Sequence, residues 1–155
     1  SPSIGGTVRG GGIYQSGETI TITATSNPGY EFDGWYKNGV QISNDMVYKF
    51  PATVTETYEA KFIISEFKIK NVNISGNIAT GNSLTFTADV TGGVPPIKYA
   101  FYIVGDGKIY YKSSAYTFAN SFTYTPNQKG EYTVIVYAAD NVDRKCTYTK
   151  VFKVN

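Results

Sequence analysis

Residues 130–140, with the sequence GEYTVIVYAAD, restrict the possible fold of this chain more than any other segment. Their side chains alternate strictly over eight positions, which indicates a β-strand. We interpret this segment as the central strand of a β-sandwich, around which the second half of the chain folds. One face carries Tyr132, Val134, Val136 and Ala138, and the other carries Thr133, Ile135, Tyr137 and Ala139.

Tyr132 stands at the start of this strand, directly after the loop TPNQKG. Immunoglobulin-like folds place a tyrosine at this point, and its hydroxyl donates a hydrogen bond back to the preceding loop. The alternative is a tyrosine that only caps the edge of the core. We interpret Tyr132 as a structural anchor.

The second half of the chain, residues 65–155, contains seven candidate strands separated by turn signals such as SGN, TGGVPP and GDG. Short strands at this spacing predict a seven-stranded immunoglobulin-like or fibronectin-like β-sandwich. The candidate strands are 66–74, 82–90, 97–104, 108–113, 118–125, 131–140 and 145–154.

The third and fourth of these strands form a predicted hairpin around Gly105–Gly107. A three-residue loop places Tyr102 opposite Tyr110 on the outer face, and Tyr137 of the neighbouring strand joins them there. A two-residue turn is rejected because it sets a lysine against the core. In the chosen register the core receives Tyr99, Phe101, Ile103, Ile109 and Tyr111.

Outward tyrosines have two interpretations. Aromatic faces stack on sugar rings and on partner surfaces, so Tyr102, Tyr110 and Tyr137 are candidate ligand-stacking residues. Cross-strand aromatic pairs also stabilise a sheet without any ligand.

The first half of the chain, residues 1–64, shows a second alternating segment at 19–25, and its apolar side chains are expected to face inward. In the next strand, YEFDGWYK, Trp35 has the wrong parity to share a face with Phe32, and a β-bulge at Gly34 corrects this. Asn38-Gly39 predicts a two-residue hairpin turn that pairs Trp35 with Ile42. Trp35 is thus a predicted structural anchor, with an exposed, ligand-stacking tryptophan as the alternative.

This first half closely resembles the divergent internalin-type B-repeat, also called the bacterial repeat domain. The resemblance implies a small β-grasp-like module of bacterial surface proteins, often repeated and without catalytic residues. The matching residues are Gly5-Gly6-Thr7-Val8, Gly17, Thr19–Thr25, Gly29-Tyr30, Phe32, Gly34-Trp35, Asn38-Gly39 and Ala60-Lys61-Phe62.

Residues 65–155 resemble the triple-tyrosine domain and related Ig-like modules of clostridial surface proteins and cell-wall hydrolases. The segments LTFTADVTGGVPPIKYAFYI and YTPNQKGEYTVIVYAAD carry this resemblance. Val134 stands where an antibody domain has its second disulfide cysteine.

The composition excludes several classes of function. The chain has no histidine and a single cysteine, so the commonest metal ligand and an intrachain disulfide are both absent. Its basic residues are scattered, which argues against nucleic-acid binding, and no apolar run is long enough for membrane insertion. We expect a monomeric piece of a longer protein, with no cofactor and no metal.

The other candidate catalytic and metal-binding residues have simpler structural explanations. Glu31 and Asp33 are the only candidates for a catalytic acid/base pair. Two acidic residues on the solvent-exposed face of a strand are, however, far commoner than a catalytic pair. Cys146 is expected to be a small core residue. A weak Ca²⁺ site in loops is left open, with oxygens from Asp106, Asp140 and Asp143.

The expected function is that of a non-catalytic accessory region of a secreted or cell-wall-attached protein of a Gram-positive bacterium. It would act as a rigid spacer, because the junction at 63–68, IISEFK, is short and has no glycine or proline run. The alternative is an adhesion module that binds a cell-wall glycan, a host glycan or a surface protein through its outward tyrosines.

Overall fold

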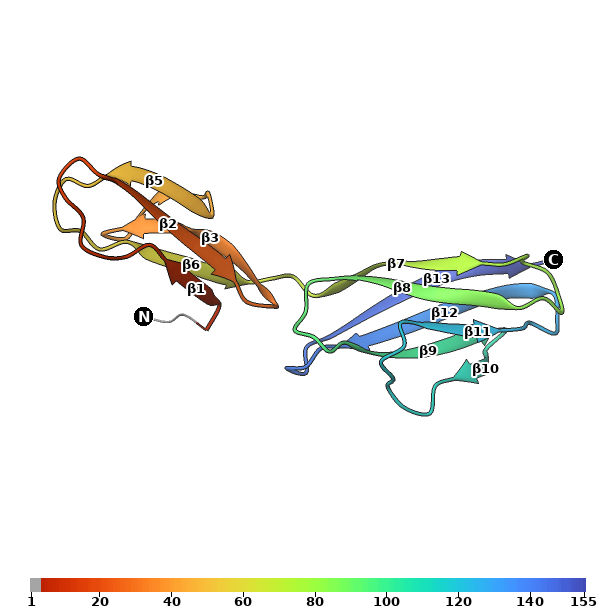
Figure 1. The fold of residues 1–155 in the computed structure, drawn as a ribbon. Helices are drawn as coiled ribbons and strands as arrows, with labels where there is room; N and C mark the ends of the chain where they lie inside the picture. Colours follow the sequence, from red (N-terminus) through yellow and green to blue (C-terminus); the bar gives the residue numbers. More distant parts are fainter. Residues whose placement is uncertain (1–3) are drawn as a thin grey trace. The chain divides into compact units, whose positions relative to one another are not determined.

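The computed structural model describes residues 4–155, so residues 1–3 of the predicted first domain lie outside the described part. The chain divides into a first unit, Ser1–Ser65, and a second unit, Glu66–Asn155. Every regular element of the described residues is a strand, as Figure 1 shows. The predicted all-β fold class is therefore confirmed.

The first unit consists of two three-stranded antiparallel sheets, ordered β1-β2-β5 and β4-β3-β6. Alternation in β2 directs Ile22 and Ala24 into the space between the sheets, where both are buried beside Trp35. The strands are β1 (Gly6–Arg9), β2 (Thr19–Ser26), β3 (Tyr30–Lys37), β4 (Val40–Ser43), β5 (Val47–Pro51) and β6 (Glu59–Ile64).

Two bulges set the position of Trp35 in this core. The first lies between Phe32 and Gly34 of β3, so the predicted bulge is confirmed, and the ring of Trp35 now contacts that of Phe32 edge to face. The second was not predicted: the Asn38-Gly39 turn forms, but an irregularity in β4 places Trp35 opposite Ser43. The predicted Trp35–Ile42 pairing is therefore wrong.

The second unit is a sandwich of a four-stranded sheet, β10-β9-β12-β13, and a three-stranded sheet, β11-β8-β7. All seven strands overlap the segments that the sequence predicts. They are β7 (Lys68–Ser75), β8 (Leu84–Thr91), β9 (Lys98–Gly105), β10 (Lys108–Lys112), β11 (Ser121–Tyr124), β12 (Gly130–Ala139) and β13 (Lys145–Val154).

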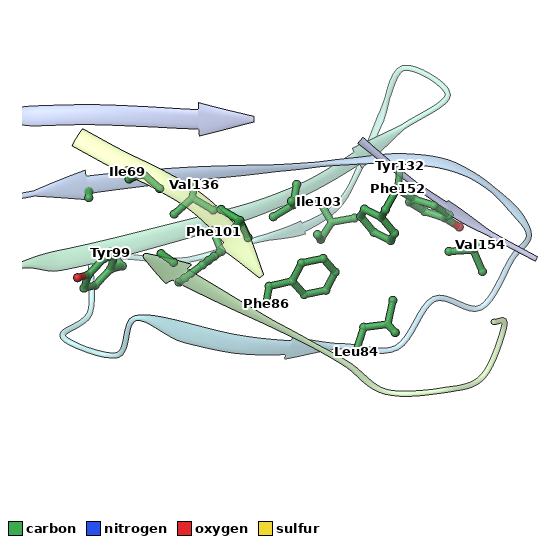
Figure 2. Packing of buried hydrophobic residues seen from close by; sticks show 14 residues of the cluster. Ile69, Leu84, Phe86, Tyr99, Phe101, Ile103, Tyr132, Val136, Phe152 and Val154 are labelled. Atoms are coloured by element: carbon green, nitrogen blue, oxygen red, sulfur yellow. The ribbon is translucent and has the colours of Figure 1, made fainter. Parts of the chain in front are cut away.

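Strand β12 lies between β9 and β13 and supplies the middle of the core. Val134 and Val136 are fully buried, and Phe86 of the facing sheet packs against Phe152. Figure 2 shows Phe86, Val136 and Phe152 of this core. The core thus forms where the alternation in residues 130–140 places it.

The β9–β10 hairpin differs from the predicted one. Asp106 and Gly107 form a two-residue turn, both with positive φ (46° and 70°), which aspartate and glycine tolerate. A bulge between Ile109 and Tyr111 then places Lys112 opposite Tyr102, away from the core. The three-residue loop is wrong, and Ile109, predicted in the core, is 62% exposed.

Tyr132 is 2% exposed, and its hydroxyl donates a hydrogen bond to the Gln128 carbonyl over 2.9 Å. The Tyr132→Phe substitution is expected to destabilise the second unit by about 1 kcal/mol, because it leaves a half-buried carbonyl without its donor. Urea melts measure the change. The control is Tyr148→Phe, which removes a hydroxyl from a half-buried tyrosine packed against the same core; equal losses from both variants would contradict the role of the corner bond.

Candidate functional site

The exposed side of the sheet β10-β9-β12-β13, here called the outer tyrosine face, is the main candidate surface. Successive residues of a strand point to opposite sides, and Tyr99, Phe101 and Ile103 of β9 point into the core. The alternate side chains therefore face outward. They include Lys98, Ala100 and Tyr102 of β9, Ile135, Tyr137 and Ala139 of β12, Lys145, Thr147 and Thr149 of β13, and Lys112 of β10.

Two of the three predicted stacking residues meet on this face. The rings of Tyr102 and Tyr137 lie 5.3 Å apart in an edge-to-face arrangement, and the Lys112 ammonium lies 5.7 Å from the centre of the Tyr102 ring. Tyr110 does not join them. The bulge in β10 turns it toward the core, where its ring contacts that of Tyr132 at 5.1 Å.

Tyr116 takes the place that the prediction gave to Tyr110. The loop after β10 follows the edge of β9, because Thr117 pairs with Tyr99 there. Since Thr117 shares the inner side with Tyr99, its neighbours Tyr116 and Phe118 point outward. Burial, and then the nearby hydroxyls of Tyr102 and Tyr137, raise the pKa of Tyr116.

The register arranges the face in rows that cross the sheet. In one row Lys98 and Lys145 stand on either side of Ala139, and Phe118 lies beside Lys98, 5.8 Å from its ammonium. In the next row Tyr137 stands beside Ala100. Ala100 and Ala139 are 6% and 7% exposed although neither belongs to the core cluster, so side chains of this face cover them.

The three candidate calcium ligands are not brought together. Asp106 lies in the turn after β9, beside the start of β12, whereas Asp140 and Asp143 follow the end of β12. Burial raises the pKa of Asp140, but hydrogen bonds from the backbone N–H of Val94, from Arg144 and from Val142 outweigh it and hold the pKa below its usual range. Its carboxylate oxygens are thus already engaged by protein donors.

Both predicted acid/base candidates lie on β3. The Asp33 carboxylate accepts a hydrogen bond from the Tyr36 hydroxyl over 2.6 Å, and Glu31 is exposed on β3. Cys146 is half-buried against the core of the second unit, and burial raises the pKa of its thiol.

Sequence reasoning missed a cavity of about 480 Å³ in the first unit. Strand β1 pairs with β2 only over Thr23–Ser26. Ile20 and Ile22 of β2 line this opening together with Phe50 and Tyr58. The charged group at its wall, Glu56, already binds Lys37 and Tyr58, each over 2.6 Å. Burial and then the bond to Glu56 raise the pKa of Tyr58 to about 12.

Comparison with known families agrees with both units. A family model of the PKD domain matches residues 70–151, more than half of the chain. The chain belongs to the PKD domain family. A model of the divergent InlB B-repeat domain matches residues 1–64, so the first unit, hereafter the B-repeat unit, precedes a PKD unit. The B-repeat and Ig-like resemblances are confirmed. No curated protein matches the chain.

These families give the chain a general role. B-repeat and PKD domains are typical of extracellular, non-catalytic regions of bacterial surface proteins, and both are compatible with protein or surface interactions. In the part of the chain that the structure describes, none of the elements is a helix of the length and apolarity that crossing a membrane requires.

Proposed function

We propose that this chain is a rigid spacer in a secreted or cell-wall-attached bacterial protein, which holds other domains at a set distance from the surface. The junction between the two units carries the proposal. The Ser65 N–H donates to the Gly29 carbonyl over 2.9 Å and so belongs to the B-repeat unit. Phe67 packs against the core of the PKD unit. Only Glu66 remains between these anchors, and it pairs with Lys68.

Phe67 is held firmly on its side of the junction. A Cβ atom at Gly93 would lie 2.8 Å from the Phe67 ring, so the absence of a side chain there makes room for it. The Arg144 guanidinium lies 5.8 Å from the centre of the same ring. A linker this short, with tethered ends, leaves few backbone dihedrals free to vary.

The proposal predicts that the two units tumble together in solution. Backbone ¹⁵N relaxation is expected to give one common correlation time for both units of the native chain. The matched control carries about ten Gly-Ser residues inserted after Glu66, which should let the units tumble separately. If the native chain already shows two distinct times, like those of the control, it is not a rigid spacer.

A second candidate function is binding of a ligand through the outer tyrosine face. The clustering of Tyr102, Tyr116 and Tyr137 on one side of the sheet favours it, because exposed aromatic rings stack on sugars and on partner proteins. The two functions are compatible in one chain.

A further inference from the structure

We propose that the outer tyrosine face of the PKD unit binds a polysaccharide that carries carboxylate groups. The inference rests on the second candidate function, since it names the ligand class of that same face. Sugar rings would stack on Tyr116 and Tyr137, and a carboxylate of the polymer would lie between Lys98 and Lys145.

The charges of the face favour an anionic ligand. Its outward positions carry four lysines and one glutamate: Lys98, Lys112, Lys145 and Lys153 against Glu131. Glu131 stands opposite Lys153 near the start of β12, far from the tyrosines. At the other end of β12 the Asp140 carboxylate is buried and bound to Arg144, and Asp143 lies in the turn beyond the strand.

Lys98 and Lys145 are spaced to share one anion. Both stand opposite Ala139, on the two strands that flank β12. Neighbouring strands lie about 4.8 Å apart, so the two lysine backbones are separated by roughly 10 Å. Ala139 between them is short and is covered by longer side chains of this face, so the two flexible lysine side chains can lie over it and bring their ammonium groups together.

The aromatic row lies directly beside this pair. Tyr137 is two residues from Ala139 on the same side of β12, about 7 Å along the strand. Tyr116 reaches the same row from the loop. Thr147 stands next to Tyr137 and Thr149 stands one row further, so hydroxyl groups flank the rings. Rings, hydroxyls and cations in adjacent rows match the stacking faces, hydroxyls and carboxylates of an acidic sugar chain.

A nucleic acid fits this surface less well. Binding to a phosphate backbone calls for a continuous basic stripe. Here the lysines are set apart by tyrosines, alanines and threonines, which suits a polymer whose charges are separated by neutral sugar surface.

The test is a titration of the full chain with decasaccharides of hyaluronate and of polygalacturonate, followed by NMR chemical shifts and by calorimetry. Each is compared with its carboxyl-reduced counterpart, which keeps the sugar rings and loses the charge. We expect shifts at Tyr116, Tyr137, Lys98 and Lys145 with at least one acidic polymer, and little or no binding of its reduced form. Affinity should fall several-fold between about 50 and 200 mM salt, because exposed charges are screened.

Matched variants locate the site. Lys98→Gln with Lys145→Gln should weaken binding about fivefold or more, the range expected for two exposed ionic contacts. The control, Lys70→Gln with Lys129→Gln, removes the same charge from β7 and from the loop before β12 and should change the affinity less than about twofold. Tyr137→Ala should also weaken binding, and its thermal melt shows whether the fold is kept.

The outcomes separate the two proposals. Equal binding of the acidic and reduced polymers at this face would overturn the inference about carboxylates and leave the face as a glycan-binding surface. Binding that both double-lysine variants weaken equally would overturn the assigned site. No binding of either form would overturn the inference and remove glycan binding from the second candidate function.

Discussion

The Trp35→Ala variant is expected to lose the folded B-repeat unit while its PKD unit stays folded. Trp35 is 2% exposed in the core of a small unit, and its ring contacts that of Phe32 edge to face. Its indole N–H donates a hydrogen bond to the Asp45 carbonyl over 3.1 Å. Truncation of a buried tryptophan costs about 3–5 kcal/mol, and small domains have little stability to spare.

The measurement is a urea titration followed by ¹H–¹⁵N spectra, in which each unit has its own signals. Fluorescence does not serve, because Trp35 is the single tryptophan of the chain. The control Trp35→Phe keeps a ring in the core and loses the indole bond, so its loss should be smaller. Simultaneous loss of the PKD signals in Trp35→Ala would mean that the two units unfold as one.

Asp140→Ala is expected to destabilise the PKD unit by about 3–5 kcal/mol, the cost of leaving one half of a buried pair without its partner. The Asp140 carboxylate is inaccessible to solvent. It accepts hydrogen bonds from the backbone N–H groups of Val94, Val142 and Arg144 at 2.9–3.1 Å and from the Arg144 guanidinium at 2.8 Å. It therefore ties the loop before β9 to the turn after β12.

The pH dependence of the same contact has a definite sign. Because the pKa of Asp140 is lowered in the folded state, its contribution is fully present above the unfolded value of about 4 and is lost as the pH falls through the folded value. Urea melts at about pH 7 and about pH 3 should show a loss for the native chain that is smaller in Asp140→Asn. An identical loss in both chains would assign the acid sensitivity to other carboxylates.

Local patterns predict much of this fold. Strict alternation in β2 and β12 determines which side chains face inward, and turn residues mark where strands end. The bulge at Gly34 follows from parity alone, since Phe32 and Trp35 can share a core only if one residue is left out of the ladder. In these segments the local preference and the packed structure agree.

The β9–β10 hairpin shows where such reasoning fails. Counting residues from a loop assumes an unbroken ladder, and a two-residue turn was rejected on that ground. The structure keeps the favoured turn and places the irregularity in β10, where it lets the Tyr110 ring pack on Tyr132. The energy of that contact depends on a residue of β12, which the hairpin sequence does not contain.

The same limit applies to the functional surface. Tyr116 reaches the outer tyrosine face because Thr117 pairs with Tyr99, a contact between a loop and a distant strand edge. Asp140 looked like a loop carboxylate because its donor at Val94 is far away in sequence. Neither residue has a local signal that separates it from an ordinary exposed loop residue.

The contact between the first and last strands of the PKD unit bears on how the unit carries load. Strands β7 and β13 run side by side in the same direction (Figure 1), and Lys150 of β13 binds the Val72 carbonyl over 2.8 Å and the Asn71 side chain over 3.3 Å. A force that draws Glu66 and Asn155 apart acts along both strands in opposite senses. It therefore shears two strands that belong to different sheets past one another. The Lys150 bonds and the core packed between the two sheets resist that shear together.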